Sequence, residues 1–244
     1  MKHESDQYGR FYGVGVGPGD DELLTIKAVR LLKQTPIIAV PRSNNNTASY
    51  AFSIIQELID LDRQEILNLI FPMRSAFAEL QTYWESAVES IAAKLLNGKD
   101  VVFITEGDPF LYSTFIYIYQ VMKKRHPLIG IEVVPGISSI NAASAFTLTP
   151  LVNGDERLAI VPATCGEQKL RQALIEFDTI ILLKIHSTFD LILSILEELA
   201  LTDQTVFVSR CSSPEENVIF DVRSLQGQKL DYFSLLIVRR QAFE

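Results

Sequence analysis

Short runs of β-branched and other apolar residues alternate with segments of helical period along almost the whole chain. This alternation is the pattern of a mostly parallel sheet covered by helices, so we expect an α/β protein. The strands expected in the first 150 residues are FYGVGV (11–16), PIIAV (36–40), EILNLIF (65–71), DVVFIT (100–105) and IEVV (131–134).

Helices are expected near residues 21–34, 48–60, 77–97, 111–124 and 138–146. The first of them shows an apolar face in Leu24, Ala28, Leu31 and Leu32, a spacing that suits packing on a sheet. The acids at 20–22 stand at its expected start, where the helix dipole favours negative charge.

The segment TLTPLVNGDE (147–156) collects proline, asparagine, glycine and acids and is the best candidate for a linker. We therefore expect two α/β domains, 1–150 and 151–244. In the second domain the last two expected strands have no helix of useful length between them, which predicts some antiparallel pairing. Its expected strands are 158–163, 179–185, 205–209, 217–222 and 232–238, and its helices lie near 167–176 and 188–200.

Net charge, cysteine and histidine spacing, and the lengths of the apolar stretches exclude several classes of partner and ligand. The 244 residues carry a formal net charge of −8, which disfavours nucleic acid and anionic membranes as partners. The two cysteines and three histidines have no metal-ligand spacing, so no metal is expected. The polar start MKHESDQYGR lacks the apolar core of a signal peptide, and charges interrupt every later apolar stretch. We expect a soluble cytoplasmic protein.

A glycine-rich stretch, residues 13–20, follows the first expected strand and opens the first helix. The dinucleotide fingerprint G-x-G-x-x-G fails in both registers, because Pro18 and Asp20 stand where glycine is required. Neighbouring acids would repel a pyrophosphate, so a ligand with positive charge fits better. The alternative is a tight turn that only lets strand and helix pack.

Two further loops hold the same place after their strands. Glu106-Gly107-Asp108-Pro109 could offer carboxylates to an amino or hydroxyl group, or Asp108 could be only a turn or capping residue. The third loop, residues 135–139, opens a helix of small side chains that suits close approach to a ligand or tight packing. Because carboxyl ends of parallel strands open on one edge, the three loops are expected to share a cleft.

These segments resemble the tetrapyrrole (corrin/porphyrin) methyltransferases, which use S-adenosylmethionine (SAM). The GDP-x-x-YSTF motif of the second loop and the segments VPAT and YFSLLIVRR resemble the sequences of one branch of this family. That branch acts on C20 of precorrin-2 in cobalamin synthesis. The chain departs from the family pattern at His186 and Ser187, where a glycine and often an arginine are expected. The matching segments are VGVGPGDDELLTIKAVRLL (14–32), EGDPFLYSTFIYI (106–118), VPGISSI (134–140), VPAT (161–164), TIILLKI (179–185) and YFSLLIVRR (232–240).

The resemblance implies a two-domain class III methyltransferase fold, a homodimer, a tetrapyrrole substrate, and SAM bound between the domains. It implies that the donor site is lined by Pro18, Gly107, Asp108, Ser138, Ser139, Leu183, Lys184 and Cys211.

Methyl transfer to carbon is an in-line displacement in which the enzyme mainly aligns donor and acceptor and excludes water. No catalytic base is assigned; Glu106 or Asp108 qualifies only if it lies within about 3 Å of the departing proton. The candidate cations for the acceptor's carboxylates are Arg42, Arg74, Lys184 and Arg210, each of which could equally be a solvated surface residue.

Three other functions stay open. The first is SAM-dependent methylation of another acceptor: another tetrapyrrole, diphthine or ribosomal RNA. The second is a dinucleotide-dependent oxidoreductase, which the failed fingerprint disfavours. The third is a tetrapyrrole carrier that transfers no methyl group.

Overall fold

The structure is a computed structural model that describes residues 7–44, 46–72 and 77–240. It divides into two compact units, Met1–Ser138 and Ser139–Glu244. The boundary expected at residue 150 falls after helix α5 (Ser139–Phe146), which belongs to the second compact unit. The domain limits 1–150 and 151–244 therefore stay a prediction.

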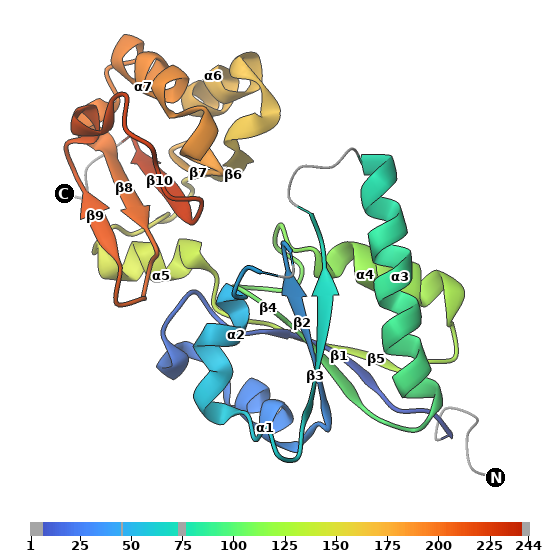
Figure 1. Cartoon of the computed structure of the whole chain (residues 1–244). Helices are drawn as coiled ribbons and strands as arrows, with labels where there is room; N and C mark the ends of the chain where they lie inside the picture. Colours follow the sequence, from blue (N-terminus) through green and yellow to red (C-terminus); the bar gives the residue numbers. More distant parts are fainter. Residues whose placement is uncertain (1–6, 45, 73–76, 241–244) are drawn as a thin grey trace. The chain divides into compact units, whose positions relative to one another are not determined.

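The described part of the first unit holds a five-stranded parallel sheet of order β3-β2-β4-β1-β5. Figure 1 shows α1 and α2 on one face of this sheet and α3 and α4 on the other. Alternate side chains of each strand therefore enter two apolar clusters: Ile38 and Val102 pack on the α1/α2 face, and Ala39 and Phe103 on the α3/α4 face. The elements are β1 (Phe11–Gly15), α1 (Ile26–Gln34), β2 (Ile37–Arg42), α2 (Tyr50–Ile55), β3 (Glu65–Ile70), α3 (Phe77–Leu96), β4 (Val101–Thr105), α4 (Phe115–Arg125) and β5 (Ile131–Val134).

The first helix begins later than expected. Thr25 caps α1 by accepting a hydrogen bond from the Ala28 amide, so the helix starts at Ile26. The acids at 20–22 lie outside it: Asp20 caps a separate 3-10 turn, Asp21–Leu23. The prediction that these acids meet the dipole of this helix was wrong, because a threonine hydroxyl further along supplies the cap.

The described part of the second unit also holds a five-stranded sheet, of order β6-β7-β10-β8-β9. β6 and β7 are parallel, whereas β10 runs antiparallel to β7 and β8, and β9 antiparallel to β8. The expected antiparallel pairing is therefore confirmed. The elements are β6 (Leu158–Pro162), α6 (Glu167–Glu176), β7 (Thr179–Leu183), α7 (Phe189–Glu198), β8 (Thr205–Ser209), β9 (Asn217–Ile219) and β10 (Ser234–Arg239).

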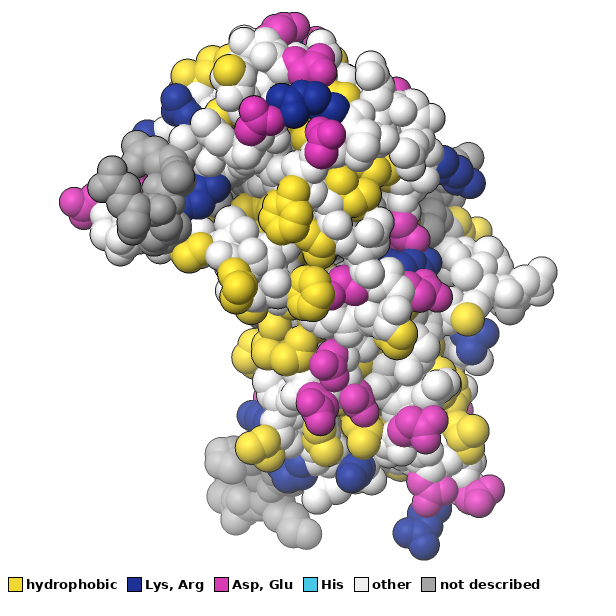
Figure 2. All heavy atoms as spheres, turned by 90° about the vertical axis from the view of Figure 1, so that its left-hand side faces the viewer, with side chains coloured by type: hydrophobic (Ala, Val, Ile, Leu, Met, Phe, Trp, Pro, Cys, Tyr) yellow, Lys and Arg dark blue, Asp and Glu magenta, His cyan; other side chains and the backbone are white. Residues whose placement is uncertain are grey.

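Charges of both signs are scattered over the face drawn in Figure 2. Together with the net charge of −8, this means that a polyanionic ligand has to be held by local cations rather than by the overall field. In the described part of the chain, no helix combines the length and apolar character needed to cross a membrane.

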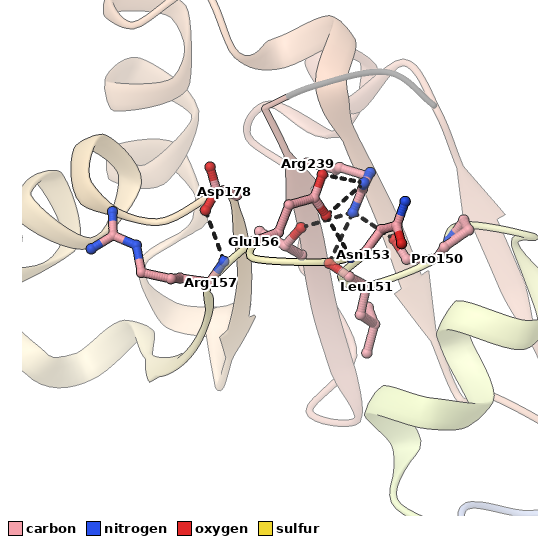
Figure 3. A network of polar contacts seen from close by, with 8 residues as sticks. Pro150, Leu151, Asn153, Glu156, Arg157, Asp178 and Arg239 are labelled. Atoms are coloured by element: carbon pink, nitrogen blue, oxygen red, sulfur yellow. Dashed lines mark hydrogen bonds and ion pairs between the residues drawn. The ribbon is translucent and has the colours of Figure 1, made fainter. Parts of the chain in front are cut away.

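A buried arginine holds the predicted linker segment to the second sheet. Arg239, at the end of β10, donates to the backbone carbonyls of Pro150 and Leu151 at 2.9 Å each and to both carboxylate oxygens of Glu156 at 3.0 and 2.9 Å (Figure 3). It also donates to the Thr179 hydroxyl on β7 at 3.2 Å. The residues from 150 to 156 are thus fixed to this sheet by one side chain.

Candidate functional site

The loops after β1 and β4 are joined through their backbones at the carboxyl edge of the first sheet. The Val16 amide donates to the Thr105 carbonyl at 2.9 Å, and the Gly107 amide donates to the Gly17 carbonyl at 2.7 Å. Beyond the parallel pairing of β1 with β4, the two loops therefore form an isolated antiparallel bridge between Gly17 and Gly107. Both glycines have positive φ, 78° and 60°, a conformation that favours glycine.

The loop after β5 closes on the same point. A Cβ atom added at Gly136 would lie 2.1 Å from the Gly107 carbonyl oxygen and 2.8 Å from the Gly15 Cα, so only glycine permits this approach. The Gly136 amide also donates to Asp108 Oδ2 at 3.1 Å. The three loops therefore meet at one edge of the sheet, whereas the cleft that we expect them to share stays a prediction.

Asp108 connects two of the loops. Its Oδ1 accepts from the Phe110 amide at 2.8 Å, which is the turn role expected from its position before Pro109. Its Oδ2 accepts from Gly136 on the neighbouring loop. Asp108 is therefore both a turn residue and a link between loops.

Asp108→Ala should weaken S-adenosylhomocysteine binding while leaving the fold intact, because both loops lose their charged hydrogen-bond acceptor. Hydrogen bonds to a charged group stabilise the folded arrangement by about 1.5–3 kcal/mol each, and a ligand that has to restore the lost loop arrangement loses binding free energy of that order, so calorimetry should show an affinity loss of at least tenfold. Asp62→Ala, which removes an exposed aspartate near the amino end of β3, is the control. Unchanged affinity in Asp108→Ala would remove this residue from the site.

The first turn of α2 contacts two of the loops. Tyr50 Oη donates to the Pro18 carbonyl at 3.2 Å, and the Ala51 amide donates to the Glu106 carboxylate. Pro18, which the resemblance placed in the site, is itself buried. Sequence reasoning missed Tyr50 and Ala51, since nothing in their local pattern distinguishes them from ordinary first-turn residues.

Glu106 is the carboxyl group at this edge whose ionisation the protein opposes. Desolvation by burial raises the pKa of Glu106, against the smaller lowering effects of its own amide and the Ala51 amide. The folded protein therefore holds this proton more tightly than the unfolded chain. The stability contributed by the bound proton is present below the ordinary pKa of 4.5 and is lost as the pH rises through the raised pKa.

Glu106→Gln should accordingly be more stable than the wild type at neutral pH, because glutamine keeps an acceptor for Ala51 and cannot ionise. The gain in the free energy of unfolding should grow from about pH 4.5 upward. Urea unfolding at a series of pH values measures it, with Glu22→Gln, an exposed carboxyl, as the control. A difference independent of pH would contradict this account of Glu106.

The two serines lie on either side of the division between the compact units. Ser138 is buried in the first unit, and its Cα lies 3.7 Å from the place a Cβ on Gly107 would occupy. Ser139 is the first residue of α5 in the second unit. The structure therefore brings Ser138 to the three joined loops.

Leu183, Lys184 and Cys211 share one edge of the second sheet. Leu183 ends β7, Lys184 follows it, and Cys211 lies two residues beyond the end of β8; both strands pair with β10 and point the same way. Lys184, Arg210 and Ser212 have positive φ values of 59°, 47° and 63°. Such backbone costs about 1–3 kcal/mol per residue and clusters at functional sites.

The side chains at this edge limit what it can do. Burial raises the pKa of the Cys211 thiol to about 11, so it is not a nucleophile at neutral pH. Arg210 is engaged by Asp231 at 2.7 Å and Glu215 at 2.9 Å. The His186 ring lies 5.2 Å from the Tyr232 ring, measured between centroids. Among the described residues, no group of three or more potential ligands is placed to hold a metal ion.

The chain resembles known proteins over nearly its full length. The family model described as "Tetrapyrrole (Corrin/Porphyrin) Methylases" matches residues 10–225. A probable cobalt-precorrin-2 C(20)-methyltransferase of Methanocaldococcus jannaschii is 37% identical, over 95% of this chain and 96% of that protein. The cobalt-precorrin-2 C(20)-methyltransferase of Salmonella typhimurium is 30% identical, over 96% and 97%.

A solved structure of a similar enzyme supports the same family assignment. The uroporphyrin-III C-methyl transferase of Thermus thermophilus, complexed with S-adenyl homocysteine, is 25% identical and superposes with a TM-score of 0.67 over 95% of this chain and 97% of its own. The chain has two α/β units, with loops joined at one edge of the first sheet, and it shares its fold with this solved enzyme. The fold is therefore that of a small-molecule methyltransferase. The chain belongs to the tetrapyrrole (corrin/porphyrin) methylase family.

Proposed function

We propose that the protein transfers a methyl group from SAM to C20 of precorrin-2, or of its cobalt-loaded form, in cobalamin biosynthesis. The proposal rests on the joining of the three loops at one edge of the first sheet. The chain also aligns over nearly its full length with relatives named cobalt-precorrin-2 C(20)-methyltransferase. Carboxyl edges of parallel sheets are where α/β proteins bind small molecules.

The residues that we propose for SAM binding are those that the family resemblance implies: Pro18, Gly107, Asp108, Ser138, Ser139, Leu183, Lys184 and Cys211. The residues fit SAM in two respects. The glycines of the loops carry no side chains, which permits close approach of a ligand to the backbone. The carboxylates of Asp20 and Asp108 also suit its ammonium and sulfonium charges.

SAM supplies an activated methyl group whose departure from sulfur disperses positive charge. The chain's own residues then have to hold donor and acceptor in line and exclude water, and no protein nucleophile is needed. This agrees with the protonated, buried thiol of Cys211. The base that removes the C20 proton stays unassigned, since no contact identifies it.

Incubation of the purified protein with SAM and precorrin-2, followed by mass spectrometry, tests the proposal. The expected product gains one methyl group in place of a hydrogen. Parallel reactions with cobalt-precorrin-2 and uroporphyrinogen III distinguish the acceptors. Unmodified precorrin-2 that co-elutes with the protein would favour a carrier, and methylation of uroporphyrinogen alone would favour a different member of the family.

We also propose that the protein is a cytoplasmic homodimer, as the family resemblance implies. Sedimentation equilibrium measures the number of chains per particle, and cell fractionation measures the location. A monomer that retains full methylation activity would contradict the dimer.

A further inference from the structure

The four basic residues considered for the acceptor's carboxylates differ in what surrounds them. Arg210 is engaged by two carboxylates, and Lys184 is exposed in the second unit. Arg74 lies outside the described residues. Arg42 is half-buried, and its Nε is fully buried without a hydrogen-bond partner among the described residues.

Arg42 lies at the end of β2, beyond the point where β2 and β4 stop pairing. The pairing of β2 with β4 covers only Ile37–Ala39, whereas β2 continues its pairing with β3 as far as Arg42. β4 instead keeps its parallel pairing with β1 as far as Thr105, and the loops that follow these two strands are joined by a separate antiparallel bridge. The two strands therefore cease to pair before their carboxyl ends, and Arg42 lies at the end of β2 beside this opening.

Strand alternation places Arg42 on the face of Ile38 and Val40, which is the face covered by α1 and α2. The first turn of α2 also contacts Pro18 and Glu106 of the joined loops. Arg42 thus shares a sheet edge and a sheet face with the candidate donor site.

A guanidinium group keeps its charge at all ordinary pH values, and buried N–H donors in native proteins almost always have an acceptor. The buried Nε has no acceptor among the described residues, and Arg42 as a whole is only half-buried, so its guanidinium is in place to meet an oxygen-bearing anion that approaches from the exposed side. A carboxylate matches the planar guanidinium with two parallel hydrogen bonds. The net charge of −8 makes such a local cation necessary for a polycarboxylate ligand.

We propose that Arg42 binds a peripheral carboxylate of the tetrapyrrole acceptor and is a substrate-specificity residue. This inference rests on the proposed function, because the acceptor's chemistry supplies the anion. It assigns Arg42 to the acceptor and not to SAM, so the two ligands should respond differently to its replacement.

The test compares Arg42→Ala, Arg42→Gln and Arg42→Lys with the wild type. Arg42→Ala and Arg42→Gln should raise KM for precorrin-2 by about tenfold to a hundredfold, the effect of losing a charge-assisted hydrogen bond. S-adenosylhomocysteine affinity and the melting temperature should stay unchanged. Arg42→Lys should retain part of the affinity through its charge. Arg63→Ala, which removes an exposed arginine near the amino end of β3, is the matched control.

Fluorescence titration with uroporphyrin III, a polycarboxylate tetrapyrrole, separates this inference from the proposed function. If the wild type leaves precorrin-2 unmethylated but binds uroporphyrin III in an Arg42-dependent way, the inference stands and the proposed function fails. If methylation occurs and Arg42→Ala changes neither KM nor uroporphyrin affinity, the inference fails alone. Equal losses of S-adenosylhomocysteine affinity, acceptor affinity and melting temperature would show a structural role and overturn it.

Discussion

Gly136→Ala is expected to abolish detectable S-adenosylhomocysteine binding and methyl transfer. The added methyl carbon would sit 2.1 Å from the Gly107 carbonyl oxygen and within 2.9 Å of two Gly15 backbone atoms. These neighbours are backbone atoms of the loop after β4 and of the end of β1, so no side-chain rotation relieves the overlap. The loops have to separate, which breaks the Asp108 hydrogen bond to Gly136 as well. Overpacking of this kind costs about 1–3 kcal/mol of folding stability.

Isothermal titration calorimetry measures the binding, and chemical denaturation measures the stability. Gly130→Ala is the matched control in the same unit, because a Cβ there would meet only Arg10 Nε, at the ordinary distance of 3.7 Å. The control should bind S-adenosylhomocysteine like the wild type. Wild-type affinity in Gly136→Ala would show that the ligand does not depend on the meeting of the three loops.

The strands could be predicted from sequence because their signal is local. Every expected strand is present, and each observed strand overlaps the range expected for it, as β5 (Ile131–Val134) and β8 (Thr205–Ser209) do in full. The first helix was misplaced because two capping signals compete near its start. The acids at 20–22 match the dipole rule, but the hydroxyl of Thr25 bonds to the Ala28 amide and sets the true start.

The gathering of the three loops could also be predicted, since it follows from parallel strands ending at one edge. The contacts that hold them together could not. Tyr50 bonds to Pro18 across 32 positions, and Asp108 reaches Gly136 across 28. Such partners depend on strand order and on side-chain direction, and a local sequence pattern predicts neither.

The candidate cations show the same limit. Arg42 and Arg210 each follow or end a strand-like run, so their sequence contexts are alike. The tertiary structure separates them, because Asp231 and Glu215 engage Arg210, whereas the buried Nε of Arg42 has no hydrogen-bond partner among the described residues. The fold, and not the neighbouring sequence, determines which residue pairs with a charged side chain.

Arg239 is the clearest case of a residue whose importance depends on distant partners. It is the last residue but one of the YFSLLIVRR segment, yet its contacts reach back by more than 80 positions to Pro150, Leu151 and Glu156 (Figure 3). Its side chain is 9% exposed and that of Glu156 is 21% exposed. Removing Arg239 leaves the largely shielded Glu156 carboxylate without its cation, and it leaves the Pro150 and Leu151 carbonyls without their donor, which costs more than the intact pair contributes.

Arg239→Ala should therefore lower the free energy of unfolding of the second unit by about 3–5 kcal/mol, the usual effect of breaking a buried pair. It should also release the 150–156 segment, which hydrogen exchange would report as faster exchange at the Asn153 and Glu156 amides. Both amides are hydrogen-bonded within that segment: the Asn153 amide donates to the Glu156 carboxylate, and the Glu156 amide to the Asn153 carbonyl.

Arg240→Ala is the matched control, since the adjacent Arg240 is exposed and bonds to the Ile175 carbonyl at the surface. Its effect should stay within about 0.5 kcal/mol. The double variant Arg239→Met with Glu156→Leu should recover much of the stability, because apolar side chains of similar volume carry no uncompensated charge. If Arg239→Ala unfolds no more readily than Arg240→Ala, the network drawn around Arg239 does not hold the segment. Stability then has to come from the apolar core beneath it, through Leu182 and Leu236 of the central strands.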